Sequence, residues 1–181
     1  LAARLLAKLR EKGWVRLIEH IADSWWREVI LLTYGCLQMD YSRMADVFID
    51  WLSHLDGNDV VRLAGAELAG AGILDLESPD PGLRQQQANR LCKLLGEVVL
   101  SVPATLRASA GRTLARLGEP RPGVGLGVDG LPDIVWTHVS AGEFIMGRMR
   151  EKHDRGESDK EPQHRVNLPA FSIAKYPVTN A

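Results

Sequence analysis

The spacing of apolar residues changes once along this chain, and the change limits the fold more than any other feature. In the first two thirds, apolar residues recur every three or four positions, as at Trp14, Leu17 and Ile21, which is the pattern of amphipathic helices. From Ile134 onward they recur at every second position, which is the pattern of β-strands. The sequence therefore predicts a mainly α chain that ends in a smaller part built from strands.

The helical pattern extends from Leu1 to about Gly118 and predicts about six or seven helices joined by short loops. Asp23 or Ser24 is expected to cap a helix that begins at Trp25 and ends near Cys36, because short polar side chains accept bonds from the free amides of the first turn. Helices with one apolar face each are typical of a helical bundle or a short α-solenoid. The residues predicted to be buried are Leu17, Ile21, Ala45, Phe48, Ile49, Leu52, Leu55, Leu91, Leu95 and Leu114.

Ser42 is expected to cap the next helix, which ends before a turn at 56–58. The segment that follows, 59–72, is rich in alanine and glycine. Glycine inside a helix costs about 1 kcal/mol relative to alanine, so we expect close packing between neighbouring helices to offset that cost. Pro103 and Gly118 are predicted to begin and end the last helix.

Proline and glycine interrupt both patterns between 119 and 133. Because such a stretch has few amides for internal bonding, we expect an exposed linker between a helical domain, 1–118, and a second domain, 134–181. The run Gly-Val-Gly-Leu-Gly at 123–127 is not followed by the Lys-Ser or Lys-Thr of a phosphate-binding loop, and no strand is predicted before it. No nucleotide site is assigned to it.

Two short strings carry the strand pattern: Ala-Gly-Glu-Phe-Ile-Met-Gly at 141–147 and Glu-Pro-Gln-His-Arg-Val at 161–166. Phe144 and Met146 are expected on one side of the first strand. The second string continues as Asn-Leu-Pro-Ala-Phe-Ser-Ile-Ala-Lys-Tyr-Pro-Val-Thr-Asn, again with apolar residues two positions apart. A second pair of strands is predicted there.

In this order the two strings resemble the opening of formylglycine-generating-enzyme (sulfatase-modifying factor) domains, whose fold is similar to C-type lectins. The resemblance covers 134–181 and implies the truncated beginning of an α+β domain. The catalytic cysteines and most metal ligands of that family lie beyond the position of Ala181, so no catalytic, cofactor-binding or metal-binding residue is carried over. Copper or calcium is implied only if the downstream domain is active. The residues that match the family motif, interpreted as structural, are Gly142, Phe144, Met146, Gly147, Glu161, Pro162, His164, Val166, Phe171, Ile173, Pro177, Val178, Thr179 and Asn180.

Two helical segments carry a second resemblance. The segment Arg-Ala-Ser-Ala-Gly-Arg-Thr-Leu-Ala-Arg-Leu-Gly-Glu-Pro-Arg at 107–121 is similar to a HEAT-type repeat, and Trp-Arg-Glu-Val-Ile-Leu-Leu at 26–32 resembles the helical region that follows the nucleotide-binding module of bacterial NACHT-type (STAND) NTPases. The resemblance implies a parent protein that binds ATP or GTP through a Walker motif upstream of Leu1. Some of these NTPases carry a formylglycine-enzyme-like domain at their C-terminal end, which is the order expected here.

Charge and composition argue against two classes of partner. The 22 Lys plus Arg nearly balance the 23 Asp plus Glu, so a net charge of -1 gives no electrostatic basis for nucleic-acid binding. No apolar run approaches the roughly 20 residues of a membrane span. Cys36 and Cys92 fall in helical patterns and are expected to be reduced thiols of a cytoplasmic protein. Because the sequence begins with Leu1 and stops within a motif at Ala181, we expect it to be part of a larger protein.

The residues with the most reactive side chains favour structural roles. The segment 148–164 gathers histidines and carboxylates among lysines and arginines, and we expect a solvated loop there rather than the fixed geometry of a metal site. His20, His54 and His138 occur singly and are expected to be packing or surface residues.

Two hypotheses of function follow. The first is interaction: a helical scaffold or sensor segment joined to a lectin-like recognition domain, with a protein partner or ligand that the sequence does not specify. The alternative is part of a formylglycine-generating or related metal-dependent oxidase whose catalytic residues lie downstream of Ala181. The unpaired edges of an incomplete sheet also predict self-association through the second domain.

Overall fold

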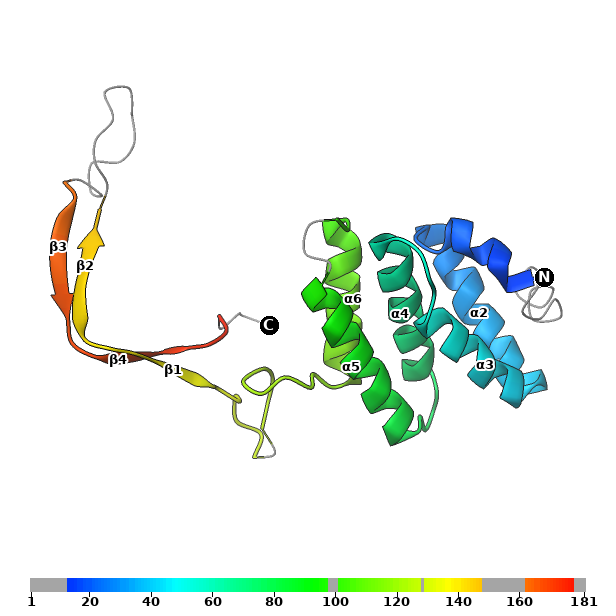
Figure 1. Ribbon diagram of the computed structural model, residues 1–181. Coiled ribbons are helices and arrows are strands. Elements are labelled where there is room, and N and C mark those ends of the chain that lie inside the picture. The colour runs from blue at the N-terminus through cyan, green and yellow to red at the C-terminus, as the bar shows by residue number, and fades with distance from the viewer. Residues whose placement is uncertain (1–12, 98–100, 128, 148–161, 178–181) are drawn as a thin grey trace, which may run out of the picture. The chain divides into compact units, whose positions relative to one another are not determined.

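The chain divides into a helical unit, Leu1–Pro120, and a unit of short strands, Arg121–Ala181 (Figure 1). It is therefore mainly α with a small β part, as the change in apolar spacing predicts. The computed structural model describes residues 13–97, 101–127, 129–147 and 162–177. The start of the helical pattern at Leu1, the segment 148–161, Val178, Thr179 and Asn180 lie outside the described residues.

Short connections join the helices of the first unit, and the strands of the second unit follow in two pairs. The first element, η1, is a 3₁₀-helix, although the spacing of Trp14, Leu17 and Ile21 fits an α-helix equally well. The elements are η1 (Val15–His20), α2 (Ser24–Asp40), α3 (Ser42–Ser53), α4 (Asp59–Leu74), α5 (Pro81–Glu97), α6 (Ala104–Leu117), β1 (Trp136–Val139), β2 (Gly142–Met146), β3 (His164–Leu168) and β4 (Phe171–Ala174).

One of the two predicted helix caps is correct. The Asp23 side chain accepts a bond from the Trp25 amide at 2.9 Å and so caps α2. The cap predicted for Ser42 is wrong, because Tyr41 alone connects α2 to α3. The Tyr41 amide still donates to the Leu37 carbonyl of α2, at 2.7 Å, and its own carbonyl accepts the first bonds of α3. Ser42 is therefore already inside the helix.

Two other helix boundaries differ from the prediction. Helix α2 continues past Cys36 to Asp40, since α3 follows without a loop that would end it earlier. Helix α5 begins at Pro81, inside the stretch 77–82 whose prolines and glycine predict a loop. Proline suits the first turn of a helix, where its missing amide hydrogen would have no partner. Gly118 ends α6 as predicted, with a φ of 110° that favours glycine.

Helix α4 is the centre of the helical unit and packs against α2, α3, α5 and α6 (Figure 1). Its small residues make that possible. A Cβ added at Gly65 would lie 2.5 Å from the Leu52 carbonyl oxygen of α3. The nearest atoms around Gly70 belong to α5 and α6, and those around Gly72 belong to α2 and α3. The close packing predicted for 59–72 is confirmed.

The core of the helical unit combines an aromatic cluster with aliphatic side chains from every helix. The ring centroids of Trp14 and Phe48 lie 4.8 Å apart, and Trp51 lies 5.8 Å from each. Of the residues predicted to be buried, all are buried except Leu95, which is half-buried. Leu91 and Leu94 of α5 face the core, so Leu95, one position further round the helix, lies at its edge.

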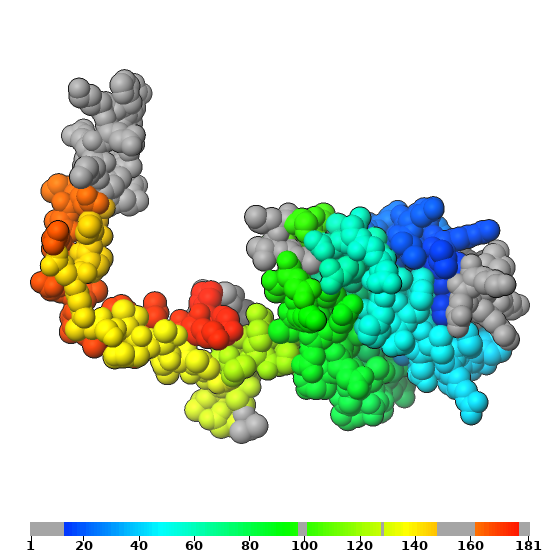
Figure 2. Space-filling model, viewed as in Figure 1, coloured from blue at the N-terminus to red at the C-terminus, as the bar shows by residue number. Residues whose placement is uncertain are grey.

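The second unit contains two antiparallel strand pairs, β1 with β4 and β2 with β3. Phe144 lies opposite Val166, so these apolar side chains share one face, while Glu143 and Asn167 share the other. In the space-filling view the strands form a narrow ribbon (Figure 2). Every described strand residue is exposed or half-buried.

The segment from Arg121 to Asp133, expected to be a linker with few internal bonds, does carry internal bonds. The Gly123 amide donates to the Asp133 carboxylate at 2.7 Å, and the Asp133 amide donates to the Gly125 carbonyl at 3.0 Å. A β-bridge joins Leu126 to Pro132. Glycine at 123, 125 and 130 takes positive φ, which lets the backbone fold back so that its amides reach partners. This part of the second unit is an ordered loop.

Candidate functional site

A groove of about 380 Å³ lies on the helical unit between α3 and α5. Both helices pack on α4, and the groove runs between the residues that they turn toward each other. The lining residues recur at spacings of three and four in each helix, so each helix contributes one continuous face. They are Ile49, Asp50 and Ser53 of α3, His54 directly after it, and Leu83, Gln86, Gln87, Asn89, Arg90 and Lys93 of α5.

The floor of the groove is fixed by a chain of buried hydrogen bonds. The Ser53 hydroxyl donates to Gln87 Oε1 at 2.7 Å, and Gln87 Nε2 donates to the Ala66 carbonyl of α4 at 2.7 Å. Ser53 and Gln87 are 5% and 4% exposed, so both side chains are held away from water with their bonds satisfied. The chain connects α3, α5 and α4 and gives the groove a rigid base.

The rim of the groove is polar. On α3, His54 Nδ1 lies 3.2 Å from Asp50 Oδ1 and 2.9 Å from the Asp50 carbonyl oxygen, so these two residues engage each other. On α5, Gln86 and Asn89 are exposed, and the Gln85 side chain donates to Asn89 Oδ1 at 3.3 Å. Arg90 differs from its neighbours, because its Nε is buried and has no hydrogen-bond partner among the described residues.

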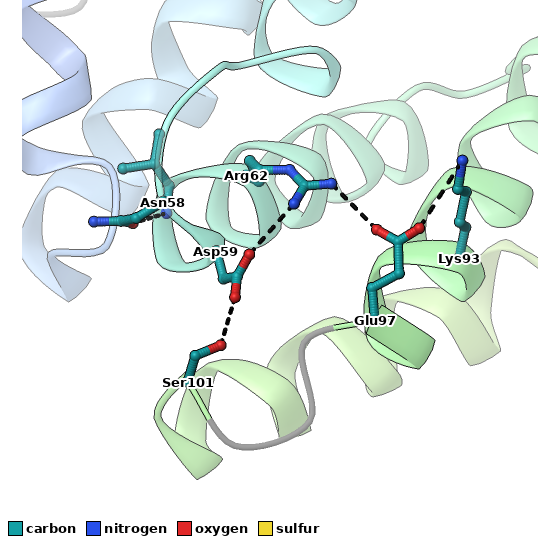
Figure 3. A network of polar contacts seen from close by, with 7 residues as sticks. Asn58, Asp59, Arg62, Lys93, Glu97 and Ser101 are labelled. Carbon is teal, nitrogen blue, oxygen red and sulfur yellow. Dashed lines mark hydrogen bonds and ion pairs between the residues drawn. The ribbon is translucent and has the colours of Figure 1, made fainter.

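At one end of the groove, Lys93 belongs to a network of ion pairs (Figure 3). Glu97 forms an ion pair with Lys93 Nζ across 3.9 Å and accepts a hydrogen bond from Arg62 Nη2 of α4 at 3.2 Å. Arg62 also contacts Asp59 at 3.3 Å, and the Ser101 hydroxyl donates to Asp59 at 2.6 Å. The network ties the C-terminal end of α5 to the N-terminal end of α4, and it commits the charge of Lys93.

A second polar cluster is buried away from the groove, around Glu67 of α4. Arg27 of α2 donates to its Oε2, and Ser109 and Thr113 of α6 donate to its Oε1 at 3.1 and 2.9 Å. Glu67 is only 1% exposed. Since both of its carboxylate oxygens are bonded from within the helical unit, this cluster braces three helices and offers no open position to a ligand.

In the second unit the family-motif residues form an exposed apolar face. Phe144 of β2 and Phe171 of β4 meet at a hollow of about 490 Å³, which Val139 and Leu168 also line. His164 Nδ1 lies 2.9 Å from the Pro162 carbonyl at the start of β3. The remaining described residues of the motif are Gly142, Met146, Val166 and Ile173 on strands, Gly147 directly after β2, and Pro177 three positions after the end of β4. Glu161 lies outside the described residues.

The described residues contain no group of three or more His, Cys, Asp or Glu side chains that could hold a metal ion. Cys36 and Cys92 are free thiols. His20 stacks on Trp26 with ring centroids 4.5 Å apart, so it is a packing residue as predicted. His54 is a surface residue, also as predicted, but it belongs to the groove.

The patterns described in the sequence do not predict the groove. The sequence feature that points to the groove is the polar run Gln85-Gln86-Gln87-Ala88-Asn89-Arg90 in α5. This helix has only a short apolar stripe. A helix that turns amides and a guanidinium toward a neighbouring helix has polar groups to satisfy. Gln87 satisfies its amide inside the fold and Gln85 bonds to Asn89, whereas Gln86 and Arg90 have no bond to the described residues.

Comparison with family models, with curated proteins and with solved structures finds no match for this chain. Among the described residues, no helix combines the length and apolar character needed to cross a membrane.

Proposed function

We propose that the helical unit is an interaction scaffold that holds a protein partner in the groove between α3 and α5. The observation that carries this proposal is the contrast between the floor and the rim of the groove. The floor is rigid, because Ser53, Gln87 and the Ala66 carbonyl satisfy one another. The rim offers amide and guanidinium groups, and those of Gln86 and Arg90 make no hydrogen bond or ion pair to the described residues. A pre-formed site with unsatisfied polar groups suits binding.

The wider context of the scaffold rests on the two resemblances described above. We infer a parent protein of the NACHT or STAND type, with an upstream module for ATP or GTP and a lectin-like recognition domain that begins with β1 to β4. The strands β1 to β4 leave an apolar face exposed around Phe144 and Phe171, and the rest of such a domain would pack there. No catalytic residue is assigned to this chain.

Site-specific photocrosslinking in the host cell tests the proposal. A photoreactive amino acid is placed at Gln86, in the groove, or at Ala115, an exposed position of α6 outside it. We expect a crosslinked protein of defined mass from Gln86 and none from Ala115. Replacing Asn89 with Trp fills the groove and should abolish the Gln86 product without lowering the melting temperature. Equal crosslinking from both positions, or none from Gln86, would contradict the proposal.

A further inference from the structure

We propose that the occupant of the groove is an extended peptide segment that carries a carboxylate, and that Arg90 binds this carboxylate. The inference rests on the proposed function and names the chemistry of the partner. It starts from the charges of the groove, which are those of Asp50, Arg90 and Lys93, together with the titratable His54.

Three of these four groups already have a partner. Asp50 and His54 engage each other across 3.2 Å, and Lys93 is paired with Glu97 at one end of the groove (Figure 3). Arg90 has no hydrogen bond or ion pair to any described residue, and its Nε is buried. The Nε atom is covered by the fold, so a carboxylate in the groove would be bound by the terminal nitrogens of the Arg90 guanidinium, which present paired donors. The groove therefore has a vacant position for one carboxylate.

The neighbours of Arg90 suit a peptide backbone. Gln86 and Asn89 lie four and one positions before it, on the face of α5 that lines the groove. A primary amide both donates and accepts, as a peptide group does. From Gln86 to Lys93 the helix rises by roughly 10 Å, at about 1.5 Å per residue. That length matches about three residues of extended chain, at about 3.3 Å each.

The remaining lining residues favour a peptide over a nucleic acid. Ile49 and Leu83 give the groove an apolar part that can accept aliphatic side chains. A phosphate backbone would need several uncommitted cations, because each phosphate carries a charge. The groove has two cations, Arg90 and Lys93, of which Lys93 is paired with Glu97, and an acidic residue, Asp50, stands opposite on α3.

A titration of the isotope-labelled whole chain, followed by NMR, tests the inference with three pools of hexapeptides built from Ala, Ser, Thr and Val. The first pool has Glu at the third position and capped ends, the second has Gln there and capped ends, and the third has Gln and a free C-terminal carboxylate. We expect shifts in α3 and α5, with at least tenfold tighter binding of a carboxylate pool than of the capped Gln pool. Preference for the first pool identifies a side-chain carboxylate, and preference for the third identifies a chain end.

Two arginine variants complete the test. Arg90→Gln should remove the preference for carboxylate, whereas Arg112→Gln, a change of the same kind at an exposed position of α6, should leave it intact. Arg90→Lys keeps the charge but loses the paired donors, so it should retain part of the preference even if Arg90→Gln folds poorly. Equal binding of all three pools, or equal loss in the Arg112 variant, would overturn the inference. If Gln86 crosslinks but all three pools bind equally, only this inference is overturned. If Gln86 gives no crosslinked product, the proposed function is overturned.

Discussion

Glu67 of α4 is a buried residue whose side chain joins three helices of the scaffold. Its carboxylate receives bonds from Arg27 of α2 and from Ser109 and Thr113 of α6, and its side chain is 2% exposed. Arg27 is 34% exposed, so the pair lies at the boundary of the core with the acid inside. Removing the acid would leave two hydroxyls and a guanidinium without their acceptor.

We therefore expect Glu67→Ala to lower the free energy of unfolding by about 3 kcal/mol. Glu97→Ala is the matched control, because Glu97 also accepts from an arginine but is 43% exposed. An exposed pair contributes about 0 to 1 kcal/mol, so the control should change little. Urea unfolding followed by circular dichroism measures both. Equal losses would show that burial of Glu67 does not matter.

Phe48 lies fully buried in the aromatic cluster of the core. It is 0% exposed and packs on Trp14 and Trp51. Phe48→Ala should cost about 3 to 5 kcal/mol, because it removes a large buried side chain and leaves a cavity. Val47, the preceding residue, is 41% exposed, and Val47→Ala should stay within about 0.5 kcal/mol. A cost near zero for Phe48→Ala, measured by the same urea unfolding, would refute its place in the core.

At the scale of elements, α4 shows why a helix rich in glycine can be stable. Gly65→Ala would bring a Cβ within 2.5 Å of the Leu52 carbonyl oxygen, which is backbone and cannot rotate away. We expect a loss of at least about 2 kcal/mol. Gly111→Ala in α6 is the control, since no atom lies within 4 Å of its added Cβ, and it should stabilise by about 0.5 to 1 kcal/mol. Thermal unfolding of the two variants should shift in opposite directions; shifts of the same sign would contradict the close packing of α4.

The elements also show how far the sequence leads. The spacing of apolar residues and the position of a glycine are local properties of the sequence. The buried stripe from Ala45 to Leu55 and the end of α6 at Gly118 could therefore be predicted. The start of α3 at Ser42 could not, because the direct junction of α2 and α3 through Tyr41 depends on how the two helices pack. The groove was not predictable either, since it exists only because α3 and α5 both pack on α4. The strand spacing predicted the paired strands, but not the internal bonds of the loop between Gly123 and Asp133.

At the scale of the whole molecule, the two units differ in how they are held together. The helical unit has a continuous core that includes side chains from η1 through α6. The strands of the second unit pair only as two two-stranded sheets, and their described residues are exposed or half-buried. Two-stranded sheets without a core are marginal in water. The proposed function therefore requires a stable helical scaffold that folds independently of the β unit.

Native-state hydrogen exchange of the whole chain, in increasing urea, tests this requirement most directly. The amides of α4 from Leu63 to Ile73 are all buried, and they should exchange only through global unfolding of the helical unit, with the free energy that urea unfolding gives. The paired amides of β2 and β3 should exchange at a lower free energy and with a smaller dependence on urea. If the α4 amides instead exchange through local openings, or share one free energy and one urea dependence with β2 and β3, then a separate scaffold organised around α4 does not exist.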